Sequence, residues 1–217
     1  DHAYGWDVGV SYQLDKHNRF GVHYRSETDV RFEGEFSNQL PAGAPFYGTQ
    51  GQALPGFVEL TLPAIAEVSG SHHINKQTAV HYSVVWTGWS SFKTLAAQVE
   101  GRGTVFSKDE NFSNSLRYAV GGDYQYNEHL KLRAGIAYDE SPADQHHMSI
   151  SIPDTDRTWF SFGGEYQLTA KSSVDIGVSI LRGKTQNFVE SDNLGQQWGF
   201  ETKGHATVLG AQYNMHF

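Results

Sequence analysis

Cysteine is missing from all 217 residues of this sequence. Its absence excludes disulfide bonds, thiolate metal sites and cysteine nucleophiles. Long apolar runs are missing too, since no stretch approaches the ~18 residues that a membrane-spanning helix needs, and this excludes a helical membrane protein. Positive charge is scarce, and the net charge of -8 argues against a nucleic-acid partner.

Proline is also scarce, with 6 residues, whereas glycine numbers 23 and aromatic residues make up 13% of the chain. That mixture favours many strands joined by tight turns over helices. The mean hydropathy of -0.50 is polar. It is nevertheless compatible with a membrane barrel, because only alternate residues of each barrel strand must be apolar.

The last twelve residues, 206–217, show the clearest periodicity. Counting back from Phe217 by twos gives a set of mostly large apolar side chains, and the intervening set is small or polar. This alternation predicts a strand between two different environments. In a water-soluble protein the apolar face would meet a core, whereas in a membrane barrel it meets lipid and the polar face lines the interior.

The same alternation recurs along the whole chain and predicts about nine antiparallel strands at hairpin spacing. Their connections alternate between short and long, as in an up-and-down barrel of the outer-membrane type. The expected strands lie near residues 6–14, 20–33, 57–70, 80–98, 116–126, 130–138, 160–168, 174–180 and 206–217. The long connections are expected at 34–56, 99–114, 139–156 and 182–197.

Charged residues within the strands support this assignment of faces. A charge on the lipid face costs ~2–4 kcal/mol at the membrane midplane, so charges should point inward. The charges opposite the aromatic face are Arg117, Asp123, Lys131, Arg133 and Asp175.

Nine is an odd number, whereas single-chain bacterial barrels have even strand counts and an open edge in lipid leaves backbone groups unpaired. We therefore expect strands to be missing from the N-terminal side. The sequence also lacks a charged-then-apolar leader, which indicates a mature or truncated chain.

Five stretches are distinctive, namely GWDVGVSYQLDKHNRFGVHYRSE (5–27), LTLPAIAEVSG (60–70), LRAGIAYDESP (132–142), SISIPDTDRTW (149–159) and SSVDIGVS (172–179). Together they resemble the FadL family of long-chain fatty acid transporters. The resemblance covers essentially the whole chain as the C-terminal half of such a protein. The final strand, which ends on an aromatic residue, also resembles the closing strand of outer-membrane barrels, where that ending is an assembly signal.

The resemblance implies a fourteen-stranded barrel with an N-terminal plug, which would be absent here. It implies passive uptake of fatty acid from outside and sideways release through the barrel wall. The inward charges then read as an interior network that supports the plug rather than as ligand contacts.

A fatty acid needs an apolar trough for its alkyl chain and a cation for its carboxylate, and each buried CH2 contributes ~0.8 kcal/mol. The first long loop supplies apolar residues for a groove, although they fit packing against the barrel rim equally well. These residues are Phe36, Leu40, Pro41, Phe46, Tyr47, Leu54 and Phe57.

The cation is assigned by the resemblance. Lys108 matches a family lysine near the barrel mouth, Phe106 would flank the alkyl chain, and Glu110 matches a nearby acidic residue. Asp139 matches a family acidic residue at the inner end of a strand. The simpler interpretation is that Asp139 is a carboxylate at the edge of a loop without a role in binding. A second cation is expected from the absent half.

No cofactor or metal is expected. The pairs His72–His73 and His146–His147 are adjacent in sequence, so on a strand their side chains point to opposite faces and form no chelate. No spacing singles out a Ser-His-acid set, so an outer-membrane lipase or protease is an alternative that the sequence does not favour. A passive structural barrel or adhesin would leave the apolar loop unexplained.

The expected partners are a long-chain fatty acid or a similar hydrophobic small molecule, and outer-membrane lipid. Detergent can occupy such a site, and we expect a monomer. An aromatic or other hydrocarbon is the alternative substrate, but an uncharged molecule would not need Lys108.

Overall fold

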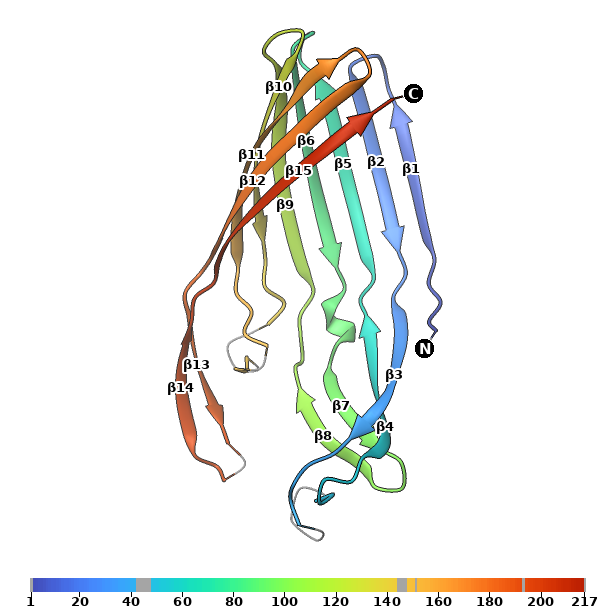
Figure 1. The fold of residues 1–217 in the computed structure, drawn as a ribbon, viewed down its shortest axis with the longest axis vertical. Coiled ribbons are helices and arrows are strands. Elements are labelled where there is room, and N and C mark those ends of the chain that lie inside the picture. Colours follow the sequence, from blue (N-terminus) through green and yellow to red (C-terminus); the bar gives the residue numbers. More distant parts are fainter. Residues whose placement is uncertain (1, 42–47, 144–147, 151, 193, 217) are drawn as a thin grey trace.

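The computed structural model describes residues 2–41, 48–143, 148–150, 152–192 and 194–216. Over these residues the protein is all-β, with one short 3-10 helix, η1 (Trp89–Ser91). No helix in the described part of the chain is long and apolar enough to cross a membrane. The expected all-β class with antiparallel strands is confirmed, and Figure 1 shows the strands as one tall curved layer with extensions at its lower end.

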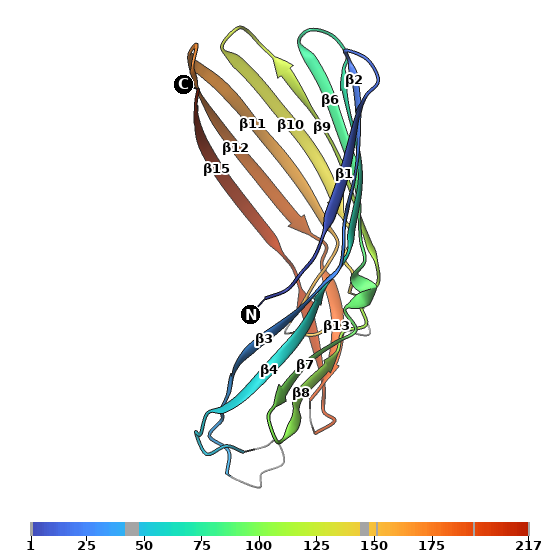
Figure 2. The same ribbon diagram turned by 90° about the vertical axis from the view of Figure 1, so that its right-hand side faces the viewer.

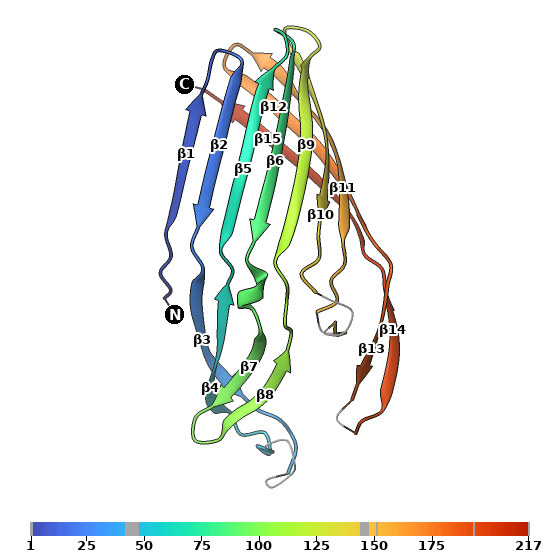
Figure 3. The same cartoon turned by 180° about the vertical axis from the view of Figure 1, so that it is seen from behind.

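The main sheet has nine strands, as the sequence predicts, and every strand pairs antiparallel with its neighbours. We call this sheet the wall. In order across it lie β1 (Asp7–Gln13), β2 (Asn18–Arg25), β5 (Ile65–His73), β6 (Thr78–Thr87), β9 (Ser115–Gln125), β10 (Leu130–Asp139), β11 (Arg157–Thr169), β12 (Ser172–Gly183) and β15 (His205–Met215). The view in Figure 2 shows how strongly the wall curves, and Figure 3 shows β1, β2, β5 and β6 from behind.

The two faces of the wall differ as predicted. Tyr118 pairs with Tyr138 and Val84, and these aromatic and aliphatic side chains share one face. Tyr118 is 43% exposed and Tyr213 is 58% exposed, so the apolar face is not covered by a protein core.

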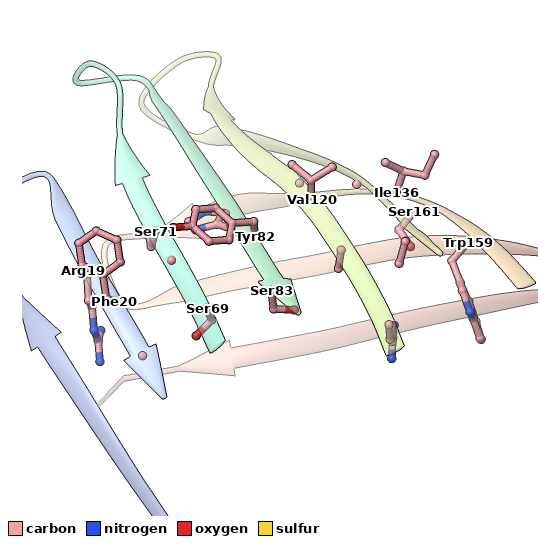
Figure 4. Close-up of a pocket in the computed structure, with 18 of the residues that line it drawn as sticks. Arg19, Phe20, Ser69, Ser71, Tyr82, Ser83, Val120, Ile136, Trp159 and Ser161 are labelled. Atoms are coloured by element: carbon pink, nitrogen blue, oxygen red, sulfur yellow. The ribbon is translucent and has the colours of Figure 1, made fainter. Parts of the chain in front are cut away.

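The opposite face of the wall carries small and charged side chains. A depression of about 760 Å³ follows its middle strands. In Figure 4, Ser83 and Trp159 project from the side of the strands opposite to Tyr82 and Val120. This arrangement is the inside-outside alternation of a barrel strand.

The charges on the polar face bind one another. The Arg133 guanidinium lies 2.5 Å from Asp175 Oδ1 and 2.7 Å from Glu165 Oε2. Lys131 Nζ lies 3.6 Å from the same Glu165 carboxylate. Four of the five predicted inward charges therefore belong to one network, which Asp123 joins at 3.9 Å from Arg133. Arg117 instead lies over the Trp159 ring, 5.9 Å from its centroid. Support of a plug stays a prediction.

All four short turns of the wall lie at one end, and the long connections lie at the other, which we call the loop end (Figure 1). The predicted strand over 80–98 is interrupted by η1. A second sheet at the loop end has the order β3 (Thr28–Phe36), β4 (Leu54–Leu62), β7 (Thr94–Val99), β8 (Gly103–Asp109). A separate hairpin pairs β13 (Gln186–Ser191) with β14 (Gln197–Thr202).

Two predicted loops are wrong. Residues 99–114 contain β8, and residues 182–197 contain β13. These strands are short and polar, so their alternation was too weak to detect, and backbone pairing with β7 and β14 specifies them instead. Gly101 and Gly103 have φ values of 73° and 77°, which close the β7–β8 turn in the left-handed region. The connection 139–156 is confirmed, because β10 ends at Asp139 and β11 begins at Arg157.

Candidate functional site

Lys108 lies on β8 at the loop end, and its side chain is only 20% exposed. Its Nζ donates to Glu190 Oε1 on β13 over 2.7 Å. The second oxygen of Glu190 accepts the Ile150 backbone N–H at 3.0 Å. One carboxylate therefore joins three segments, namely β8, β13 and the connection between β10 and β11.

Glu190 was not predicted, and no local signal in the sequence could have identified it. It lies 82 residues from Lys108 in the chain. Burial alone would raise the pKa of the Glu190 carboxyl, but the Ile150 hydrogen bond and the Lys108 ammonium outweigh burial and lower that pKa. Glu190 is therefore an anion at neutral pH.

Glu110 follows β8 directly and is 1% exposed. Its backbone N–H donates to the Lys93 carbonyl at 2.8 Å. Within the described residues neither of its carboxyl oxygens has a hydrogen-bond partner. Burial raises the pKa of Glu110, the Lys108 ammonium partly opposes this, and the charge of Glu190 adds to it. The predicted acidic neighbour of Lys108 is thus a buried group that favours its protonated form.

An apolar strip crosses the second sheet beside Lys108. Cross-strand partners share a face, and the register places Phe32 opposite Val58 on β4, Val58 opposite Ala97 on β7, and Ala97 opposite Phe106 on β8. Phe32 is 50% exposed and Phe106 is 47% exposed, so this row, the apolar strip, is open at the surface.

The predicted trough residues divide between the strip and its surroundings. Phe36 lies four positions beyond Phe32 on β3, on the same face, and pairs with Leu54. Lys108 lies two positions from Phe106 on β8 and shares that face. The structure therefore brings Phe36, Leu54, Phe106 and Lys108 to one face of one sheet.

The other first-loop residues are placed differently. Leu40, 40% exposed, and the exposed Pro41 follow β3 in the loop. Phe57 does not share the face of the apolar strip, because it lies on the opposite face of the sheet, where the Arg31 guanidinium sits 3.6 Å from its ring centroid. Phe46 and Tyr47 lie outside the described residues.

Asp139 belongs to a different cluster, at the end of β10. Its carboxylate lies 3.2 Å from Arg157 on β11, and Arg157 also reaches Asp154 at 3.1 Å. Asp139 and Arg157 line a hollow of about 640 Å³ together with Arg25 and Arg117. Arg157 was not nominated, although it ends the SIPDTDR stretch on which part of the resemblance depends.

Among the described residues, the histidine pairs do not form a metal site. His72 Nδ1 lies 2.7 Å from Asn18 Oδ1, and its ring sits between those of Phe20 and Tyr82 at 5.4 and 5.6 Å. The described residues contain no group of three or more His, Asp or Glu side chains that could hold a metal ion. His146 and His147 lie outside the described residues.

Comparison with known proteins adds independent findings. The sequence pattern of the family described as "Outer membrane protein transport protein (OMPP1/FadL/TodX)" matches residues 1–217. The chain is 41% identical over 222 residues to the 47 kDa outer membrane protein of Pasteurella multocida, covering 99% of this chain and 50% of that protein. It is 38% identical over 221 residues to the long-chain fatty acid transport protein of Escherichia coli K12, covering 99% of this chain and 48% of that protein.

Among solved structures, the chain resembles the crystal structure of a Pseudomonas aeruginosa FadL homologue. The TM-score is 0.80 at 24% sequence identity, and the match covers 96% of this chain and 50% of that one. This likeness concerns the fold. The chain spans about half the length of the curated relatives it matches.

Proposed function

The chain belongs to the OMPP1/FadL/TodX family of outer-membrane transport proteins, and from this premise we propose that it takes part in passive uptake of long-chain fatty acids. The ligand would bind at the loop end and pass through the barrel wall. We also propose that residues 1–217 form the C-terminal part of one barrel domain, which works as a monomer in outer-membrane lipid.

One observation carries this proposal: Lys108 lies beside the apolar strip on the same face of the second sheet. A long-chain fatty acid is an alkyl chain with a carboxylate at one end. Each CH2 that the strip removes from water contributes ~0.8 kcal/mol. The Lys108 ammonium supplies a charge-assisted hydrogen bond to the carboxylate.

The strip and the lysine also discriminate between substrates. An aromatic hydrocarbon would use Phe106 and Phe32 but has no group for the Lys108 ammonium. The family includes hydrocarbon transporters, so this substrate is the alternative within transport. The pairing of cation and strip favours the fatty acid, and we propose no catalytic activity.

The test is growth of a transporter-deficient host on oleate as sole carbon source, with the full-length protein supplied. We expect growth with the wild type and binding of labelled oleate to the purified protein. Lys108→Ala should weaken oleate binding roughly tenfold, or about 1.4 kcal/mol, because it removes the charged partner of the carboxylate.

The matched control is Lys76→Ala, which removes an exposed lysine from the turn between β5 and β6 at the opposite end of the wall. It should leave oleate affinity unchanged. Equal oleate affinity in Lys108→Ala and the wild type would remove Lys108 from the site. Uptake of toluene without uptake of oleate would favour the alternative substrate.

A further inference from the structure

The Lys108 ammonium already has a carboxylate partner, and that partner belongs to the chain itself. Glu190 is a carboxylate held by two donors, Lys108 Nζ at 2.7 Å and the Ile150 N–H at 3.0 Å. We propose that Glu190 is a built-in competitor, occupying the anion site that Lys108 and the Ile150 N–H form until the carboxylate of the ligand displaces it. This inference rests on the proposed function.

The chemistry of the site supports direct competition. A fatty acid head group and a glutamate side chain are the same functional group, so the two donors that satisfy one can satisfy the other. The Lys108 ammonium cannot bind both carboxylates at full strength, because a Glu190 oxygen already lies 2.7 Å from Nζ. The side chains of Lys108 and Glu190 are 20% and 28% exposed, which leaves little room for a second carboxylate.

The segment that carries Glu190 is built to move as a unit. Strands β13 and β14 pair only with each other among the strands of the described chain. Their turn is tied by Asp192, whose carboxylate accepts from the N–H groups of Leu194 and Gln196 and from Trp198 Nε1. Displacement of Glu190 therefore leaves the hairpin held by its own pairing and by its apolar contacts, and a hairpin without further support is only marginally stable.

The face of the hairpin that carries Glu190 also carries apolar anchors. Phe188 and Phe200 are cross-strand partners on that face, with ring centroids 5.5 Å apart, and Phe188 is 5% exposed. Glu190 lies two positions beyond Phe188. The ion pair of Glu190 and the two phenylalanine rings anchor the same face of the hairpin. Release of the ion pair therefore removes only part of that anchoring.

Competition by Glu190 would select for carboxylate ligands that bind Lys108 tightly enough to displace it. When the competent form of a site is only a fraction of the population, the apparent affinity falls by that fraction. Glu190 imposes this reduction on a carboxylate ligand, because both need Lys108. A neutral ligand that uses only the apolar strip does not compete with Glu190.

The experiment measures equilibrium binding of oleate and of oleyl alcohol to the purified full-length protein at pH 7.4. Glu190→Gln should bind oleate roughly threefold to tenfold more tightly, the range expected for a partly buried ion pair. Its affinity for oleyl alcohol should not change. In the Lys108→Met background, Glu190→Gln should no longer tighten oleate binding.

Glu201→Gln is the matched control. Glu201 lies on β14 of the same hairpin, next to Phe200 in sequence and therefore on the opposite face. Its substitution changes the charge of the hairpin by the same amount without touching Lys108, so oleate affinity should stay at the wild-type value.

A second readout needs no variant. Hydrogen exchange of residues 186–202 in the wild type should speed up when oleate binds, because the Glu190 anchor is released, and should not respond to oleyl alcohol. Unchanged exchange on oleate binding would overturn the proposal, as would weaker or equal oleate binding by Glu190→Gln, the result expected if Glu190 positions Lys108. Binding of oleate to none of the variants would instead overturn the fatty-acid function itself.

Discussion

The wall and the loop end of this protein are stabilised in different ways. On the wall, large side chains such as Leu209 and Ile176 are 78% and 64% exposed, and the apolar face has no protein core behind it. At the loop end, Phe92, Phe112, Met148 and Phe188 are 5–8% exposed, so this end holds most of the packed apolar interior of the described chain. One sequence thus leaves large apolar side chains exposed on the wall and packs them against one another at the loop end.

The two regions also treat charge differently. On the wall, the Arg133 guanidinium faces several carboxylates in a partly open setting, with its side chain 42% exposed. At the loop end, the Glu110 carboxyl is buried at 1% exposure and has no hydrogen-bond partner among the described residues. The wall distributes its charges in a network, whereas the loop end buries a carboxyl group without a hydrogen-bond partner near Lys108.

The largest effect should come from the core of the loop end. The Phe112 ring packs against Phe92 and Trp89, with centroids 5.3 and 5.9 Å apart. Phe112→Ala should destabilise this end by about 3–4 kcal/mol, because it removes a buried ring and leaves a cavity. Hydrogen exchange of β7 and β8 should speed up while exchange in the wall strands stays slow.

The control for that variant is Tyr118→Leu on the apolar face of the wall, where the side chain is 43% exposed. It should change the free energy of unfolding by ~0.5 kcal/mol or less. If Phe112→Ala and Tyr118→Leu lowered stability equally, the loop end would have no core of its own and the comparison would be wrong.

The wall was predictable from the sequence because its signal is local. Neighbours such as Leu132 and Arg133 alternate in polarity, and alternation alone fixes which face each side chain takes. The nine strands and the sorting of short and long connections followed from that pattern. The position of Phe57 was not decided by this signal, because Leu54 was expected in the connection 34–56. Only β4, which runs from Leu54 to Leu62, puts the two side chains on opposite faces.

The loop end was less predictable because its signal is not local. Lys108 and Phe106 were nominated through the family resemblance, since a lysine on a short polar strand has no distinguishing periodicity. Glu190 meets both Lys108 and the Ile150 N–H only because three separate connections converge. Such contacts depend on the packing of β13 and β14, and residue pattern within one segment does not encode them.

A smaller effect is expected for the charge network of the wall. Arg133→Met keeps much of the side chain's length but leaves Asp175, Glu165 and Asp123 without their shared guanidinium. Stability of the full-length protein in detergent should fall by about 1–2 kcal/mol, a value kept low because the arginine is partly exposed. Thermal unfolding at low salt measures it.

Lys171→Met is the control for Arg133→Met, because Lys171 is exposed in the turn between β11 and β12. Loss of the Lys171 charge should leave the stability of the protein nearly unchanged. High salt should reduce the difference in stability between the wild type and Arg133→Met, since screening weakens the ion pairs that the variant lacks. A variant as stable as the wild type at low salt would mean that the network contributes nothing to the wall.

The smallest effect concerns the pH dependence of the loop end. Burial raises the pKa of Glu110 above its unfolded value, so the folded protein binds this proton more tightly than the unfolded chain does. The resulting stability is present below the unfolded pKa and is lost as pH rises through the folded pKa. Glu110→Gln carries no titrating group there, so the loop end should be more stable than the wild type at pH 8 and should lose that advantage at pH 4. Hydrogen exchange of β8 at the two pH values, corrected for intrinsic rates, measures this difference, and an advantage of equal size at both would show that desolvation of the charged carboxylate is not the cause.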